Sequence, residues 1–156
     1  ERLRGGVDRA TRLVEQLLTL AFGRLIPYVR TSGVRVESLS AERAVVSIPN
    51  AKHVRNHIGG LHAVAMALVA ESATGYLVGM NVPDSAVPVI KTMKIDYPKR
   101  AKGGLRAVAT LTPEQIESIR TQPKGEVTVG IVVTDESDRQ PIVCEMIWAW
   151  TPKRRD

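Results

Sequence analysis

One acidic residue, Glu71, lies in the middle of a long apolar stretch of the chain. Between Leu61 and Met80 the only other ionisable side chains are His62 and Tyr76. The stretch is rich in alanine and long enough for a helix of about five turns. Because apolar residues occur on nearly every face of this helix, we expect it to be buried on all sides. A carboxylate is costly to bury unless it is paired or used in chemistry, so Glu71 is a candidate nucleophile or general base.

A polar, glycine-containing turn leads directly into this stretch. Asn56 precedes Gly59 and Gly60, and His62 stands at the start of the apolar segment. Glycine permits close approach of a substrate, whereas asparagine is also a common turn residue. His62 is also compatible with a hydrogen-bonding role at the helix start without chemistry, and Glu71 with a structural ion pair, so these alternatives stay open.

The spacing of His62 and Glu71 argues against one site within one chain. Nine helical residues rotate by about 900° and rise by about 13 Å, which places the two side chains on opposite sides of the helix. They can meet across a two-fold axis that sets antiparallel helices side by side. We therefore expect an obligate oligomer with a shared site.

The elements that position these residues follow from hydrophobic periodicity and turn chemistry. The pattern predicts an amphipathic helix, two strands, the long apolar helix and four further strands, with a short helix begun by a capping box at Thr112 and Gln115. We expect an α+β fold, an antiparallel sheet of about six strands curved around the central helix. We assign residues 1–30 to an N-terminal helical segment and residues 31–156 to the main domain. The predicted ranges are 9–26, 34–37, 43–48, 61–80, 89–97, 105–111, 126–134 and 142–151.

The first predicted helix carries Leu13, Leu17 and Leu20 at helical spacing, and Pro27 ends it. Its apolar stripe favours a helix that docks on the rest of the protein. A helix that lies on a membrane surface is the alternative.

The motif and the order of elements together resemble the hotdog fold, in the thioesterase superfamily of the phenylacetic-acid-degradation type. Asn56, Gly59, His62 and Glu71 fill the places of the family motif in register. The resemblance covers residues 34–150 and is closest to a subgroup with an extra N-terminal helix. One departure is Ala63, where the family usually has glycine. Another concerns the third strand, where some relatives place a catalytic serine that this chain lacks.

The resemblance implies hydrolysis of an acyl-coenzyme A thioester at a site shared by two subunits. Glu71 of one subunit would be nucleophile or general base, and the Ala63 N–H at the helix start would stabilise the oxyanion. Asn56 would orient the water or the carbonyl, and His62 would polarise or position the substrate. Further substrate-binding candidates are His57, Gly59, Gly60 and Thr92.

The chain carries a net charge of +6, which is compatible with nucleic acid, a phosphate-bearing ligand or merely a basic surface. Aromatic residues are scarce and no nucleic-acid motif is present, so we expect no nucleic-acid partner. Coenzyme A carries three phosphates, for which the basic turn with Lys99, Arg100 and Lys102 is the first candidate. Lys52 and Arg55 come next, and a solvated basic loop is the alternative.

Two other functions are compatible with the same residues. A hotdog dehydratase or hydratase has a fourteen-residue spacing between its histidine and its acid, which His57 and Glu71 match, but its signature prolines are absent here. A non-catalytic acyl-coenzyme A binder is the second. Hotdog proteins that bind acyl-coenzyme A as transcriptional regulators normally carry an added helix-turn-helix segment, and this sequence predicts none.

The remaining expectations concern compartment and partners. One cysteine, Cys144, allows no intrachain disulfide, and no secretory signal is recognised, which together favour the cytoplasm. The apolar stretch is long enough to span a bilayer, but Glu71, Gly75 and Gly79 favour a buried core helix. We expect a homodimer or a dimer of dimers, no membrane partner, no metal and no cofactor apart from the coenzyme A thioester as substrate.

Overall fold

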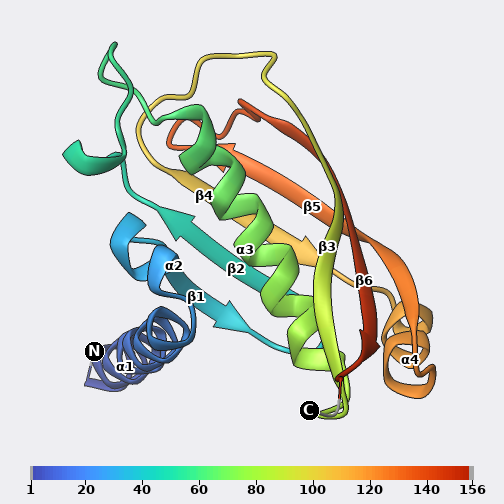
Figure 1. Cartoon of the computed structure of the whole chain (residues 1–156). Helices are drawn as coiled ribbons and strands as arrows, with labels where there is room; N and C mark the ends of the chain where they lie inside the picture. The colour runs from blue at the N-terminus through green and yellow to red at the C-terminus, as the bar shows by residue number, and fades with distance from the viewer. Residues whose placement is uncertain (1, 155–156) are drawn as a thin grey trace.

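A six-stranded antiparallel sheet curves around one long helix, α3 (Ala63–Asn81), in the computed structural model (Figure 1). The structure describes residues 2–154, and the side chains of the first helix from residue 10 onward. The predicted α+β hotdog fold is confirmed. The other elements are α1 (Arg2–Leu25), α2 (Pro27–Ser32), β1 (Arg35–Leu39), β2 (Arg43–Ile48), β3 (Ala86–Asp96), β4 (Leu105–Thr110), α4 (Pro113–Thr121), β5 (Gly125–Asp135) and β6 (Val143–Pro152), with a 3-10 turn at Lys52–Val54.

The strand order is β1-β2-β4-β5-β6-β3, so neighbours in the sequence are not always neighbours in the sheet. β3 pairs with β6, the last strand, and forms one edge of the sheet, while β1 forms the other. A register shift between Ile90 and Thr92 interrupts the β3–β6 ladder. Hydrophobic alternation predicted each strand, but not which strands would pair.

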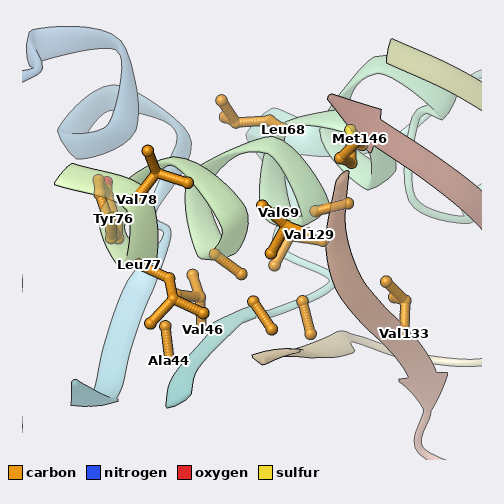
Figure 2. Close-up of a cluster of buried hydrophobic side chains, with 14 of the residues drawn as sticks. Ala44, Val46, Leu68, Val69, Tyr76, Leu77, Val78, Val129, Val133 and Met146 are labelled. Atoms are coloured by element: carbon orange, nitrogen blue, oxygen red, sulfur yellow. The ribbon is translucent and has the colours of Figure 1, made fainter. Parts of the chain in front are cut away.

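The core lies between α3 and the concave face of the sheet. Figure 2 shows Val69 and Leu77 of α3 above Ala44, Val46 and Val129 of the strands, and all five are buried. The expectation that α3 is buried on all sides is wrong for its N-terminal half. Ala63 and Val64 are exposed and Glu71 is only half-buried. A single sheet covers one side of a helix, so the opposite face stays open in one chain.

By length and composition α3 also passes as a membrane span, but most of its apolar window is buried inside the fold. This is the burial of a core helix, as the sequence predicted.

The C-terminal half of α3 packs closely against Trp148 of β6. The indole N–H donates a hydrogen bond to Thr74 Oγ1 at 2.9 Å, which fixes the ring over Gly75. A Cβ added at Gly75 would lie 2.6 Å from that ring. Gly75 therefore has a packing role, although glycine by itself weakens a helix.

We expect Gly75→Ala to destabilise the protein by about 1–3 kcal/mol because the added methyl overpacks the core. Gly79→Ala is a matched control in the same helix, since no atom lies within 4 Å of the added Cβ. That control should stabilise the helix by up to about 1 kcal/mol. Chemical denaturation of both variants measures the difference. Equal effects of the two substitutions would contradict the packing role of Gly75.

Helix α1 is attached to the β1 edge of the sheet and extends the predicted helix toward the N-terminus. Thr19 Oγ1 accepts a hydrogen bond from the backbone N–H of Val36 at 3.0 Å, so α1 satisfies a donor of β1. Phe22 stacks on Tyr76 of α3 with ring centroids 4.1 Å apart. Pro27 ends α1, as predicted. It also begins the short helix α2, because proline is favourable at the first position of a helix as well as after the end of one. The sequence pattern did not predict this second helix.

Candidate active site

The turn that precedes α3 is built around the side chain of Asn56. Its Oδ1 accepts hydrogen bonds from the backbone N–H groups of Ile58 at 3.0 Å and Gly60 at 3.1 Å, and its Nδ2 donates to the Leu61 carbonyl at 3.3 Å. Gly59 has a φ of 80°, which favours glycine in this turn. Asn56 therefore has the turn role that the sequence left open, and it positions the start of α3.

His62 caps the N-terminus of α3. Its Nδ1 accepts a hydrogen bond from Val64 N at 3.1 Å, and its backbone N–H donates to the Val54 carbonyl at 2.9 Å. In the neutral imidazole the proton is then on Nε2. The imidazole is exposed, so its Nε2 edge is accessible from solvent.

The backbone N–H of Ala63, the first residue of α3, makes no hydrogen bond within the described part of the chain. The first N–H groups of a helix have no partner inside the helix and lie at the positive end of its dipole. Ala63 is also exposed. The start of α3 thus presents a donor to an incoming carbonyl oxygen.

Tyr97 was not among the predicted site residues. Its hydroxyl donates a hydrogen bond to the Ala63 carbonyl at 2.9 Å and so joins the end of β3 to the first turn of α3. Burial, with a contribution from Cys144, raises the pKa of the Tyr97 hydroxyl, which keeps it a donor. The sequence contained one signal, because Tyr97 lies at the start of the basic turn that carries Lys99, Arg100 and Lys102.

The basic turn after β3 lies at the same end of the molecule as the start of α3 (Figure 1). Lys99, Arg100 and Lys102 are exposed, and no hydrogen bond or ion pair of the described residues engages their side chains. The backbone of Lys102 is fixed, since its N–H donates to Asp135 Oδ2 at 3.0 Å. Lys52 is also exposed, whereas the Arg55 guanidinium donates to the Asn50 carbonyl at 2.9 Å.

Asp135 anchors this turn. Burial alone would raise the pKa of the Asp135 carboxyl, but hydrogen bonds from the Ser137 hydroxyl and from the backbone N–H groups of Lys102, Ser137 and Arg139 outweigh it and hold the pKa far below its usual range. The carboxylate is therefore charged at neutral pH and serves the loop structure.

Glu71 lies at the edge of the open face of α3, half-buried. Burial raises the pKa of its carboxyl above the ordinary 4.5, and the nearby Ser72 hydroxyl partly opposes this shift. No cation of the described residues lies within 4 Å of the carboxylate, so the structural ion pair is absent from the single chain. The buried hydroxyls of Ser72 and Tyr76, on the adjoining face, also lack hydrogen-bond partners among the described residues.

The structure brings some predicted site residues together and separates others. Asn56, Gly59, Gly60, His62 and Ala63 form one cluster at the N-terminus of α3. Within the described residues, no hydrogen bond or ion pair connects Glu71, the exposed His57 or Thr92 of β3 to this cluster.

Eight helical residues separate Ala63 from Glu71, or about 12 Å along the axis, which is too far for both to reach one acyl carbon. Two surface depressions of the single chain, one bordered by Arg35 and Arg106 and one by Glu114 and Trp150, contain none of these residues. No three His, Cys, Asp or Glu side chains group as metal ligands in the described chain.

Comparison with known proteins places the chain in a family. A family described as a domain of unknown function (DUF4442) matches residues 14–150. The chain is a DUF4442 protein. No curated protein matches it.

Solved structures resemble this DUF4442 chain closely in fold. A Pseudomonas aeruginosa protein of unknown function, described as a probable thioesterase, shares 26% identity with a TM-score of 0.79, over 88% of this chain and 95% of that one. A Haemophilus influenzae thioesterase shares 12% identity with a TM-score of 0.66, over 80% and 82% of the chains. A thioesterase family protein from Silicibacter pomeroyi shares 16% identity with a TM-score of 0.69, over 86% and 96%. The last two similarities concern the fold alone.

Proposed function

We propose that this DUF4442 protein is an acyl-coenzyme A thioesterase whose active sites are each built from two chains. Two observations on the open side of α3 carry the proposal: among the described residues, no cation lies within 4 Å of the half-buried Glu71 carboxylate, and no acceptor engages the Ala63 N–H. A carboxylate and an oxyanion donor are the parts that thioester hydrolysis needs. The Pseudomonas aeruginosa relative, described as a probable thioesterase, supports the same reaction class.

The surface of the chain suits a second copy at this face. Val64 is half-exposed, and the small Ala67 between Val64 and Glu71 permits close approach of another helix. The adjoining edge strand β3 exposes Val89 and Met93, and no strand of residues 2–154 pairs with its outer edge. A two-fold axis at this edge would extend the sheet and set two α3 helices antiparallel, with Glu71 of each near Ala63 of the other.

The proposed reaction proceeds at the thioester carbonyl. The thioester carbonyl oxygen accepts a hydrogen bond from the Ala63 N–H of one chain. His62 and Asn56 of that chain hold the turn that positions this N–H. As general base, Glu71 of the partner takes a proton from water while the water oxygen bonds to the carbonyl carbon. Collapse of the tetrahedral oxyanion breaks the C–S bond, and the proton on Glu71 passes to the leaving thiolate. In the nucleophilic variant of the same site, the Glu71 carboxylate attacks the carbonyl carbon, the C–S bond breaks and the thiolate leaves. Water then cleaves the acyl-enzyme anhydride, which releases the carboxylic acid and restores Glu71.

A screen of acyl-coenzyme A thioesters of increasing chain length, with free thiol as the readout, tests the proposal. Release of thiol that scales with enzyme supports hydrolysis. Saturable acyl-coenzyme A binding without turnover would instead identify a non-catalytic binder. Conversion of an enoyl thioester without free thiol would identify a hydratase that uses His57 and Glu71.

We propose that the phosphates of coenzyme A lie near Lys99, Arg100 and Lys102. Replacement of all three by glutamine should raise KM, weaken its dependence on salt and largely preserve kcat, because the charges act on binding and not on the reacting bond. Lys124→Gln, on the loop before β5, is the control and should leave KM unchanged. An unchanged KM in the triple variant would place the phosphate site elsewhere.

The shared site also predicts an oligomer at working concentrations. Sedimentation velocity at micromolar concentration should show a dimer or a dimer of dimers. Val64→Arg should shift the protein toward monomer and reduce turnover together, because a charge at the helix–helix contact is costly to bury. An active wild-type monomer would refute the two-chain site.

A further inference from the structure

Away from the proposed site, helix α1 directs its most apolar face outward. Leu13, Leu17 and Leu20 repeat at a spacing of four and three residues and lie on one side of the helix. Their exposed fractions are 56%, 58% and 49%. Val14 is exposed on the same side. An apolar helix face of this extent is unusual on a free surface and indicates a binding surface.

The orientation of α1 is held by contacts on its opposite side. Leu18 and Phe22 pack against the core, and Thr19 Oγ1 accepts a hydrogen bond from the Val36 N–H. Rotation of the helix to bury its leucines would break these contacts. The outward leucines are therefore a stable feature of the fold.

The apolar surface continues past the end of α1 and is accompanied by basic residues. Leu25, the last residue of α1, and Tyr28 of α2 are exposed, and Arg24 and Arg30 in the same two helices are exposed as well. Residues 2–25 contain five arginines and two acidic residues, a net charge of +3. A basic amphipathic helix with leucines on its apolar side, followed by an exposed tyrosine in the next helix, has the composition of a segment that lies at an anionic lipid surface.

Two observations favour lipid over a second copy of the chain. A second α1 would carry the same positive charge, and helical spacing places its Glu15, the one acidic side chain described on this helix, on the side of Leu18 and Phe22 and away from the leucines. In addition, α1 lies at the β1 edge of the sheet and β3 forms the other edge (Figure 1), so a two-fold axis at β3 leaves both α1 faces uncovered.

We propose that the outward face of α1, with Leu13, Val14, Leu17, Leu20 and the flanking arginines, docks on an anionic membrane surface. The sequence alone favoured a helix that docks on the protein itself. The structure shows that α1 does so with its less apolar side, which leaves the leucines for a partner. This surface is independent of Glu71 and of turnover.

Vesicle co-sedimentation of the full chain tests the proposal. We expect binding to vesicles of phosphatidylcholine and phosphatidylserine in equal amounts, little binding to phosphatidylcholine alone, and release by salt. Leu13→Gln with Leu17→Gln should reduce the bound fraction about tenfold or more, since glutamine keeps helix propensity and removes the apolar face. Val132→Gln, a similarly exposed apolar residue on β5, is the matched control and should bind as the wild type does.

Each alternative result overturns the proposal. Absence of phosphatidylserine-dependent binding would refute it, and so would equal binding by the double variant. If the double variant instead sediments as a smaller species in solution and the wild type does not bind vesicles, the face is a contact between copies of the chain. Circular dichroism and melting temperature on the same samples establish that the variants are folded. None of these readouts requires thioesterase activity, so failure here leaves the proposed function standing.

Discussion

Glu71→Gln should lower kcat for a responsive acyl-coenzyme A by about 10² or more while the fold is retained. The amide is nearly isosteric but can neither accept the proton of water nor attack the carbonyl, and acid–base contributions are of this order. The proposed general-base and nucleophilic roles both predict the loss. Glu117→Gln, on the exposed face of α4, is the matched control and should have normal turnover.

The same substitution should not destabilise the protein at neutral pH. Because burial raises the pKa of Glu71, the folded chain binds its proton more tightly than the unfolded chain does. The free energy of unfolding therefore falls as pH rises from the unfolded pKa through the raised folded pKa, and the ionised carboxylate lowers stability above both. Glutamine removes this cost, so the melting temperature should be equal or higher. In the wild type, kcat/KM should decline as pH falls through the raised pKa. A stable Glu71→Gln variant with near-normal turnover would refute the assignment.

Ala63→Pro should lower kcat by about 10²–10³, because proline removes the one N–H that we assign to the oxyanion. Proline is well tolerated at the first helical position, and it requires an extended residue before it. His62 meets this requirement with φ −63° and ψ 142°. The proline variant keeps the backbone carbonyl of residue 63, which accepts a hydrogen bond from the Tyr97 hydroxyl. Ala63→Ser keeps the N–H and should remain active, and normal turnover of the proline variant would exclude this N–H from the reaction.

The two variants together test whether the site is shared. In an equal mixture of Glu71→Gln and Ala63→Pro chains that assemble at random, half of the dimers are mixed. Each mixed dimer has one site with both defects and one intact site if Glu71 and Ala63 come from different chains, so about one quarter of wild-type activity should return. A site within one chain predicts no recovery, because every chain carries a defect.

Local patterns in the sequence predicted most of the elements. The capping box at Thr112 and Gln115 begins α4, and both reciprocal hydrogen bonds are present. Periodicity placed α3 and every strand to within a few residues, because alternation and helical spacing are properties of neighbouring residues. The spacing of His62 and Glu71 likewise determined, without coordinates, that one regular helix cannot bring them together.

Only the tertiary structure decided how these elements meet. The position of β3 beside β6 and the hydrogen bond from Tyr97 to Ala63 depend on residues far apart in the chain. The turn role of Asn56 depends on where its amide points, which residue type alone leaves open. The sequence established that the first helix has an apolar stripe and that Glu71 lies in an apolar run. Packing decides which side of α1 faces solvent and leaves Glu71 without a cation among the described residues, because burial and charge pairing are properties of the assembled fold.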